Sequence, residues 1–168
     1  MSIQLCLFDL DNTLLRTSDL EGFRGRENVN NTSREYTRGL LREYDRRDDR
    51  LLYTPEQLAD LQDAFPDMRW GVFTRAPRHY ATTLLEEAYP DVEWDIVVAY
   101  EDVRNTKPHP EGIEIAARRL LQFHLTWNGF HLTAIAVVDV HRSIMDHGTG
   151  HGSISEGIKR RFYLTRMR

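Results

Sequence analysis

Residues 8–15 read FDLDNTLL, and this stretch decides the fold that we expect. It closes a run from Ile3 to Phe8 that is apolar apart from Gln4. Such a run is typical of a strand buried on both faces of a parallel sheet. Two carboxylates, Asp9 and Asp11, follow at once, and open parallel sheets bind ligands at the carboxyl ends of their strands. The stretch therefore predicts a sheet and marks the edge that carries the chemistry.

Strand-like and helix-like segments alternate along the rest of the chain. Short β-compatible runs cover residues 70–73, 95–100, 134–138 and, more weakly, 162–164. Helical patterns with one apolar face cover residues 33–46 and begin near Thr54, Pro77 and Pro110. Their faces include Leu58, Leu61 and Phe65 in the helix after Thr54, and Tyr80, Leu84, Leu85 and Ala88 in the helix after Pro77. The alternation predicts an α/β fold with a three-layer, doubly wound parallel sheet.

Residues 16–50 interrupt this alternation. Residues 16–31 are polar and contain Gly22 and Gly25, which predicts a loop or a small hairpin over the sheet. The mixed-charge run RRDDR at residues 46–50 predicts a solvated turn. At 168 residues and 19.7 kDa we expect one domain spanning residues 1–168, with a short flap or cap insertion around residues 16–50.

Polar groups recur at the ends of the predicted strands. Thr74 and Arg75 follow the strand at 70–73. Lys107 lies in the sequence KPHP, just before the helix that begins near Pro110, and Asp139 follows the strand at 134–138. A simpler interpretation exists for residues 9–13 alone. Asp, Asn and Thr side chains bond their own backbone, so the stretch also fits a plain turn with a helix cap.

The order of these groups resembles the motifs of the haloacid dehalogenase superfamily over almost the whole chain. The resemblance implies a Rossmann-like core and a phosphatase that forms an aspartyl-phosphate on Asp9. Asp9 is ionised at neutral pH, so it needs no base to act as a nucleophile. Asp11 is expected to act as general acid and base. Thr74 and Lys107 are expected to be catalytic and to bind the phosphate, with Arg75 in contact with the substrate.

A magnesium ion belongs to this interpretation, because the Asp9 charge repels a phosphate dianion. The resemblance implies that the Asp9 carboxylate, the Asp11 main-chain carbonyl and the Asp139 carboxylate hold Mg²⁺. Two positions depart from the superfamily pattern: Val138 stands where relatives have glycine, and Ser143 stands where a second acid is usual. Asp146 is the nearest later carboxylate, and we expect it to reach the ion only through water.

Two alternatives to a phosphatase remain open. The altered region after Asp139 fits a catalytically silent binding or regulatory module, and the same motifs fit a phosphomutase. Asp11 argues against a dehalogenase, which lacks this second carboxylate. The order of the groups argues against a response-regulator receiver, because the lysine of a receiver comes last in the chain, whereas the last group here is Asp139.

The composition limits the partners. A net charge of −4 and a pI near 6.0 do not suggest nucleic acid or an anionic membrane as a partner. The chain has no apolar run of about 20 residues and no secretory signal, so a cytoplasmic location is expected. The basic stretch at 159–168 predicts a solvated tail, with an acidic partner or a following domain as alternatives. The interval from Asp9 to Thr74 is too short for a large lid. A small phosphorylated substrate is expected, with a larger one or a site closed by a second copy as alternatives.

Overall fold

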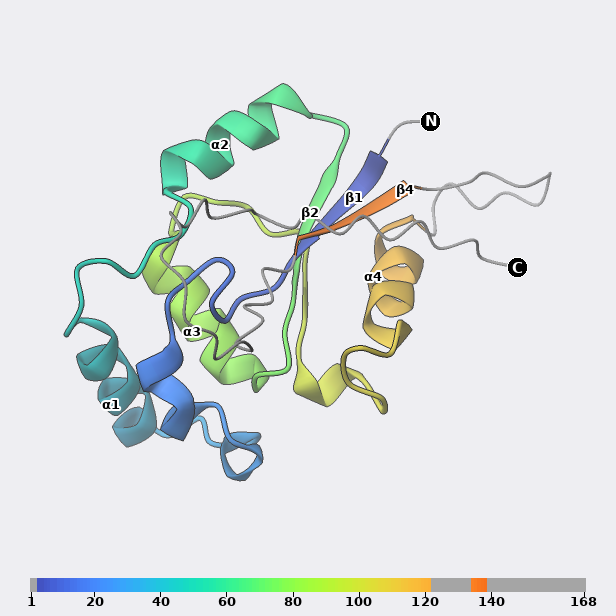
Figure 1. The fold of residues 1–168 in the computed structure, drawn as a ribbon. Coiled ribbons are helices and arrows are strands. Elements are labelled where there is room, and N and C mark those ends of the chain that lie inside the picture. Colours follow the sequence, from blue (N-terminus) through green and yellow to red (C-terminus); the bar gives the residue numbers. More distant parts are fainter. Residues whose placement is uncertain (1–2, 122–133, 139–168) are drawn as a thin grey trace, which may run out of the picture.

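The structure is a computed structural model that describes residues 3–121 and 134–138. Its four strands are β1 (Ile3–Phe8), β2 (Arg69–Phe73), β3 (Ile96–Val98) and β4 (Ala134–Val138). Its α-helices are α1 (Arg34–Tyr44), α2 (Pro55–Ala64), α3 (Arg78–Ala88) and α4 (Glu111–Leu121). Three short 3₁₀ helices are η1 (Ser18–Phe23), η2 (Arg26–Asn28) and η3 (Tyr100–Asp102). Figure 1 shows the sheet between two layers of helices.

The strands form one parallel sheet in the order β3-β2-β1-β4. The chain first moves from β1 outward to β2 and β3, and it then returns to place β4 on the other side of β1. The strand order therefore reverses at β1, and this switch point is where open α/β sheets bind ligands. Phe8 pairs with Val72 on one side and with Val138 on the other, so these strands end level with one another. The predicted doubly wound parallel fold is confirmed.

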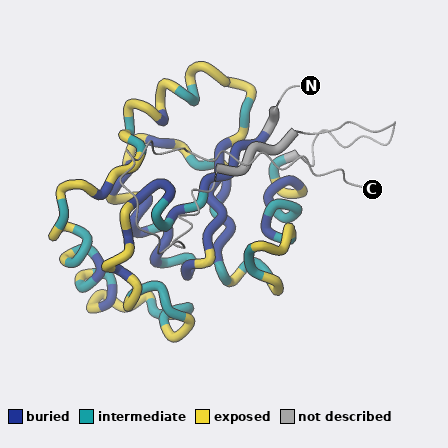
Figure 2. The backbone as a smooth tube through the Cα atoms, viewed as in Figure 1, coloured by how far each residue is buried: buried dark blue, intermediate teal, exposed yellow. Residues whose placement is uncertain are grey.

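Alternation along the strands builds two separate cores. Phe8 and Val72 pack with residues of α1, α2 and α3 on one face of the sheet. Leu7 and Phe73 pack with Ala116 of α4 on the other face. Successive strand residues point to opposite faces, so one apolar run serves both layers. Figure 2 shows that the central strands and α3 are the most buried elements, whereas α2 is exposed along much of its length.

The expected helices form close to the expected residues. Ser33 accepts a hydrogen bond from the Tyr36 amide at the start of α1, and Thr54 forms a capping box with Gln57 at the start of α2. One detail of the predicted apolar faces is wrong. Phe65 lies after the end of α2 and is 50% exposed. The helix ends at Ala64, so the ring falls outside the regular repeat that buries Leu58.

The predicted hairpin within residues 16–31 does not form. The segment folds into η1 and η2 instead, which are closed by short-range bonds such as Leu20 N–H to the Thr17 carbonyl (2.9 Å). Asn28 donates from its side chain to the Gly22 carbonyl (3.1 Å), which links the two turns. Polar side chains that bond the nearby backbone favour such turns over paired strands. The loop alternative was therefore closer to the structure.

The prediction of a solvated turn at 46–50 is wrong for Arg50. Its side chain is only 3% exposed and forms two hydrogen bonds with the Asp19 carboxylate, at 2.6 and 2.8 Å. It also donates to the carbonyls of Arg16, Glu43 and Tyr44. The buried guanidinium joins the segment before η1 to the end of α1, because its five donors satisfy several acceptors at once.

Several expectations fall on residues outside the described ranges. They are the strand at 162–164, the groups Asp139 and Asp146, and the basic stretch at 159–168. Cys6 lies in the described sheet and is buried as expected of a core residue. Burial raises the pKa of its thiol to about 12. Within the described residues, every helix is too short or too polar to cross a bilayer.

Candidate active site at the carboxyl edge of the sheet

The loop after β1 is shaped by backbone bonds and by Asn12. The Leu10 carbonyl accepts hydrogen bonds from the amides of Thr13, Leu14 and Leu15. Asn12 takes a left-handed backbone conformation (φ 58°), which asparagine tolerates better than most residues. Its side chain accepts from the Thr17 amide (3.2 Å). Asn12 therefore carries much of the turn-forming role that residues 9–13 suggested, and Asp9 and Asp11 also make contacts with distant segments.

Asp9 pairs with Lys107 at the end of β1. The Lys107 Nζ atom lies 2.8 Å from Asp9 Oδ1, and both side chains are less than one-fifth exposed. Asp9 Oδ1 also accepts from the Leu10 amide at 2.9 Å. The ammonium lies 4.8 Å from the centre of the Phe73 ring, which is a cation–π distance. Lys107 arrives from the segment before α4, so a residue distant in sequence reaches the predicted nucleophile.

Asp11 is surrounded by donors from three other segments. Its Oδ1 atom accepts from the Thr17 hydroxyl at 2.7 Å and the Tyr80 hydroxyl at 3.0 Å. Arg24 Nη1 lies 3.2 Å from the same oxygen. The Thr74 hydroxyl donates to Oδ2 at 3.4 Å. These contacts hold the carboxylate in place.

Tyr80 is a fully buried member of this network. Burial, followed by the nearby charge of Asp11, raises the pKa of the Tyr80 hydroxyl far above its ordinary value. The hydroxyl therefore stays protonated at neutral pH and remains a donor to Asp11. For Arg24, burial is the largest single effect and lowers the pKa of the guanidinium, but Asp11, Tyr80 and Glu21 together raise that pKa above its ordinary value.

Thr74 is fixed between two strands and the next helix. Its amide donates to the Val98 carbonyl at 2.9 Å, and its hydroxyl accepts from the Ala76 amide at 3.0 Å. Arg75 lies next to it and is exposed, and no hydrogen bond or ion pair joins Arg75 to another residue within the described ranges. The structure thus brings Asp9, Asp11, Thr74 and Lys107 together. It leaves Arg75 at the same edge without a defined contact.

Three residues near Asp11 were not predicted as part of the site: Thr17, Arg24 and Tyr80. Tyr80 fits the apolar face of its helix, and this pattern says nothing about the position of its hydroxyl. Arg24 lies in a polar segment with other arginines, and no periodic pattern distinguishes it from them. Their roles depend on how the segment 16–31 folds back over the strand ends, which the sequence pattern does not specify.

The donor atoms at this edge suit a hard cation. The Asp9 carboxylate and the Asp11 main-chain carbonyl are oxygen donors, the type that Mg²⁺ prefers. The third expected ligand, Asp139, lies outside the described residues, although β4 ends at Val138 beside Phe8. No group of three His, Cys, Asp or Glu side chains within residues 3–121 and 134–138 is arranged to hold a metal ion. The described donors fit part of a magnesium site.

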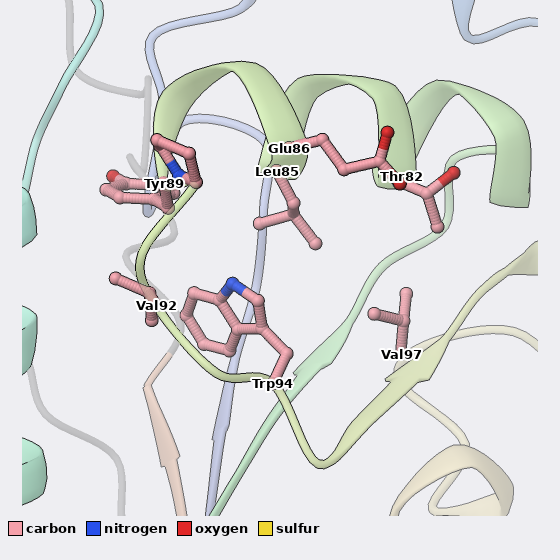
Figure 3. A pocket seen from close by; sticks show the side chains of 8 residues that line it. Thr82, Leu85, Glu86, Tyr89, Val92, Trp94 and Val97 are labelled. Carbon is pink, nitrogen blue, oxygen red and sulfur yellow. The ribbon is translucent and has the colours of Figure 1, made fainter.

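A cavity of about 380 Å³ lies elsewhere in the molecule. Figure 3 shows Leu85 of α3 and Tyr89, the residue after α3, lining it together with Trp94. The Trp94 indole N–H is buried and has no hydrogen-bond partner among the described residues. Trp94 precedes β3, so this cavity lies toward the amino end of that strand. It is therefore separate from the edge that carries Asp9 and Asp11.

Comparison with known proteins supports the fold. No family model matches the chain, and no curated protein matches it. Solved structures with a similar fold include a Thermotoga maritima protein described as a β-phosphoglucomutase, with 17% identity, a TM-score of 0.52, and coverage of 80% of this chain and 75% of that one. Another is a Bacteroides fragilis protein described as a haloacid dehalogenase-like hydrolase, with 22% identity, a TM-score of 0.48, and coverage of 71% and 74%.

These identities are low, so the likeness concerns the fold. The chain shares its fold with the Thermotoga maritima protein, and its motifs at the strand ends separately resemble those of the haloacid dehalogenase superfamily. A shared fold does not by itself assign a substrate or a mechanism.

Proposed function

We propose that this chain is a magnesium-dependent phosphohydrolase that cleaves a phosphate monoester through an aspartyl-phosphate on Asp9. The observation that carries the proposal is the meeting of Asp9, Asp11, Thr74 and Lys107 at the switch point of the sheet. A nucleophile, an acid–base group, a hydroxyl and a cation are the groups that stepwise phosphoryl transfer requires.

In the first step an Asp9 carboxylate oxygen attacks the phosphorus, and the bond from phosphorus to the ester oxygen breaks. The departing oxygen takes a proton from Asp11, so an alcohol leaves. Lys107, 2.8 Å from Asp9, reduces the repulsion between the carboxylate and the incoming phosphate. Thr74 donates to a phosphoryl oxygen and fixes the line of attack.

In the second step water attacks the phosphorus of phospho-Asp9, and Asp11 accepts the proton of that water. Inorganic phosphate leaves and the Asp9 carboxylate is restored. Thr17, Arg24 and Tyr80 each place a donor group beside the Asp11 carboxylate. The same donors hold the carboxylate beside the nucleophile, so one group serves both steps.

Asp9, the Asp11 carbonyl and Asp139 would hold Mg²⁺, and Asp146 would act through water. When bound, the ion would neutralise phosphate charge and align the phosphoryl group with Asp9. One carboxylate fewer than in the usual pattern should raise the magnesium concentration that activity requires. We further propose one domain over residues 1–168 with a minimal cap, acting on a small phosphorylated substrate that Arg75 also contacts.

Hydrolysis of p-nitrophenyl phosphate with and without magnesium tests the proposal, beside Asp9→Asn and an exposed control, Asp67→Asn. Activity should require magnesium, survive in the control and be lost in Asp9→Asn. Activity that persists in Asp9→Asn would refute the mechanism. A silent module predicts no turnover over a broad panel of phosphate esters, and a phosphomutase predicts isomerised product in place of inorganic phosphate.

A further inference from the structure

Arg24 places a cation beside the group that protonates the leaving alcohol. It follows η1 directly, and its Nη1 atom lies 3.2 Å from Asp11 Oδ1. The preceding residue is anchored, because the Phe23 carbonyl accepts from the Tyr36 hydroxyl at 2.6 Å and the two rings pack edge to face. The guanidinium is therefore held at the site by a fixed backbone.

The second amino group of Arg24 is paired differently. Nη2 lies 2.9 Å from the Glu21 carboxylate, and the Glu21 side chain is 73% exposed, whereas that of Asp11 is only 13% exposed. Exposed ion pairs contribute little to stability, so the contact with Glu21 is easily exchanged. Arg24 thus has one firm partner inside the site and one replaceable partner at its mouth.

Distances limit what reaches Arg24. The ester oxygen of a substrate must approach Asp11 to about 3 Å to receive its proton. Arg24 lies 3.2 Å from the same carboxylate. A group two or three bonds from the ester oxygen therefore falls within reach of the guanidinium. Lys107 pairs with Asp9, the residue that receives the phosphoryl group, so Lys107 serves the transferring phosphate. Arg24 lies beside Asp11 and serves the leaving group.

We propose that Arg24 binds a carboxylate on the leaving alcohol, and that Glu21 occupies this place in the free protein. The preferred substrates are then phosphate monoesters of short hydroxy acids. The exchange replaces one carboxylate by another, so the charge around Arg24 is conserved. A planar guanidinium also matches a carboxylate with two parallel hydrogen bonds. The inference rests on the proposed phosphohydrolase activity and names its substrate class.

Phosphoglycolate and its amide form a matched pair of probes, because only the former carries the second anion. The measurement is kcat/KM for each, in the wild type, Arg24→Gln, Arg24→Lys, Glu21→Gln and the control Arg38→Gln. Arg38 is exposed on α1 and lies outside the site. Circular dichroism of each variant checks that it is folded.

The wild type should prefer phosphoglycolate. Arg24→Gln should lower the ratio of kcat/KM for phosphoglycolate to kcat/KM for the amide by roughly 10- to 100-fold, because it removes a charge-assisted hydrogen bond to the substrate carboxylate. Arg24→Lys should retain part of this ratio. Glu21→Gln should raise kcat/KM for phosphoglycolate several-fold and leave the amide unchanged, since a competitor is removed. Arg38→Gln should leave the preference unchanged.

Two results would overturn the inference in distinguishable ways. In the first, both probes are hydrolysed in an Asp9-dependent manner, but the wild type shows no preference for phosphoglycolate, or its preference is the same in Arg24→Gln and Glu21→Gln. Arg24 then has no role in specificity, while the proposed function stands. If the wild type hydrolyses neither these probes nor p-nitrophenyl phosphate, the proposed function fails and the inference fails with it.

Discussion

At the scale of single residues, Asp11 is the point where separate parts of the chain meet. It receives donors from Thr17, Arg24, Thr74 and Tyr80, which lie in or beside three different elements. The contacts of Asp9 include the Lys107 ammonium and the Leu10 amide. The two carboxylates are two positions apart in sequence, yet they contact different groups, and we propose different roles for them: nucleophile for Asp9 and acid–base group for Asp11.

Replacing Asp11 by Asn should separate these roles. The metal ligand expected at this position is the main-chain carbonyl, so phosphate and metal binding should survive while acid–base catalysis is lost. With an alkyl phosphate, kcat should fall by roughly 10² to 10⁴ while KM changes little. Steady-state kinetics beside the exposed variant Asp67→Asn measure this. Near-normal turnover in Asp11→Asn would remove the acid–base role.

At the scale of elements, Arg50 determines how the segment between β1 and α2 is held. Its guanidinium joins the Arg16 carbonyl, the Asp19 carboxylate and the end of α1. The residues that shape the mouth of the site, including Arg24, lie between these anchor points. The contacts of Arg50 therefore hold residues 16–50 in place.

Arg50→Met should destabilise the protein by about 3 kcal/mol, because it leaves buried carbonyls and a carboxylate without their donor. Urea unfolding of wild type and variant provides the value. Arg46→Met is the matched control: that side chain is 69% exposed and, among the described residues, forms an ion pair with Glu43 alone, so its loss should cost about 0.5 kcal/mol or less. Equal effects of the two substitutions would contradict the structural role of Arg50.

The pairing of Asp19 with Arg50 also predicts a dependence on pH. The hydrogen bond from Arg50 lowers the pKa of the Asp19 carboxyl below its ordinary value. The contribution of the pair is therefore complete above the pKa of about 3.9 of an unfolded aspartate and is lost as the pH falls through the lower, folded pKa. Urea unfolding between pH 7 and pH 3 should show a smaller loss of stability in Asp19→Asn than in wild type. Parallel curves would exclude this contribution.

At the scale of the whole molecule, the sequence predicted the sheet better than the cap. The strand from Ile3 to Phe8 and the helix carrying Tyr80 and Leu84 follow from regular apolar patterns, which local chemistry determines. The meeting of Asp9 with Lys107 follows from parallel topology, because strand ends gather at one edge. The contacts of Arg24 and Arg50 were missed because both residues lie in irregular turns. No periodic pattern in such turns predicts which way a side chain points.

The central claim is that Asp9 carries the phosphoryl group, and the Asp11→Asn variant tests it most directly. p-Nitrophenol leaves without a proton, so this variant should still form the intermediate but hydrolyse it slowly. Rapid mixing with p-nitrophenyl phosphate and magnesium should give a burst of about one p-nitrophenol per enzyme. Peptide mapping of the acid-quenched protein should then find the phosphoryl group on Asp9. A phosphoryl group on any other residue, or a burst that persists when Asp9→Asn is added to the variant, would contradict the account.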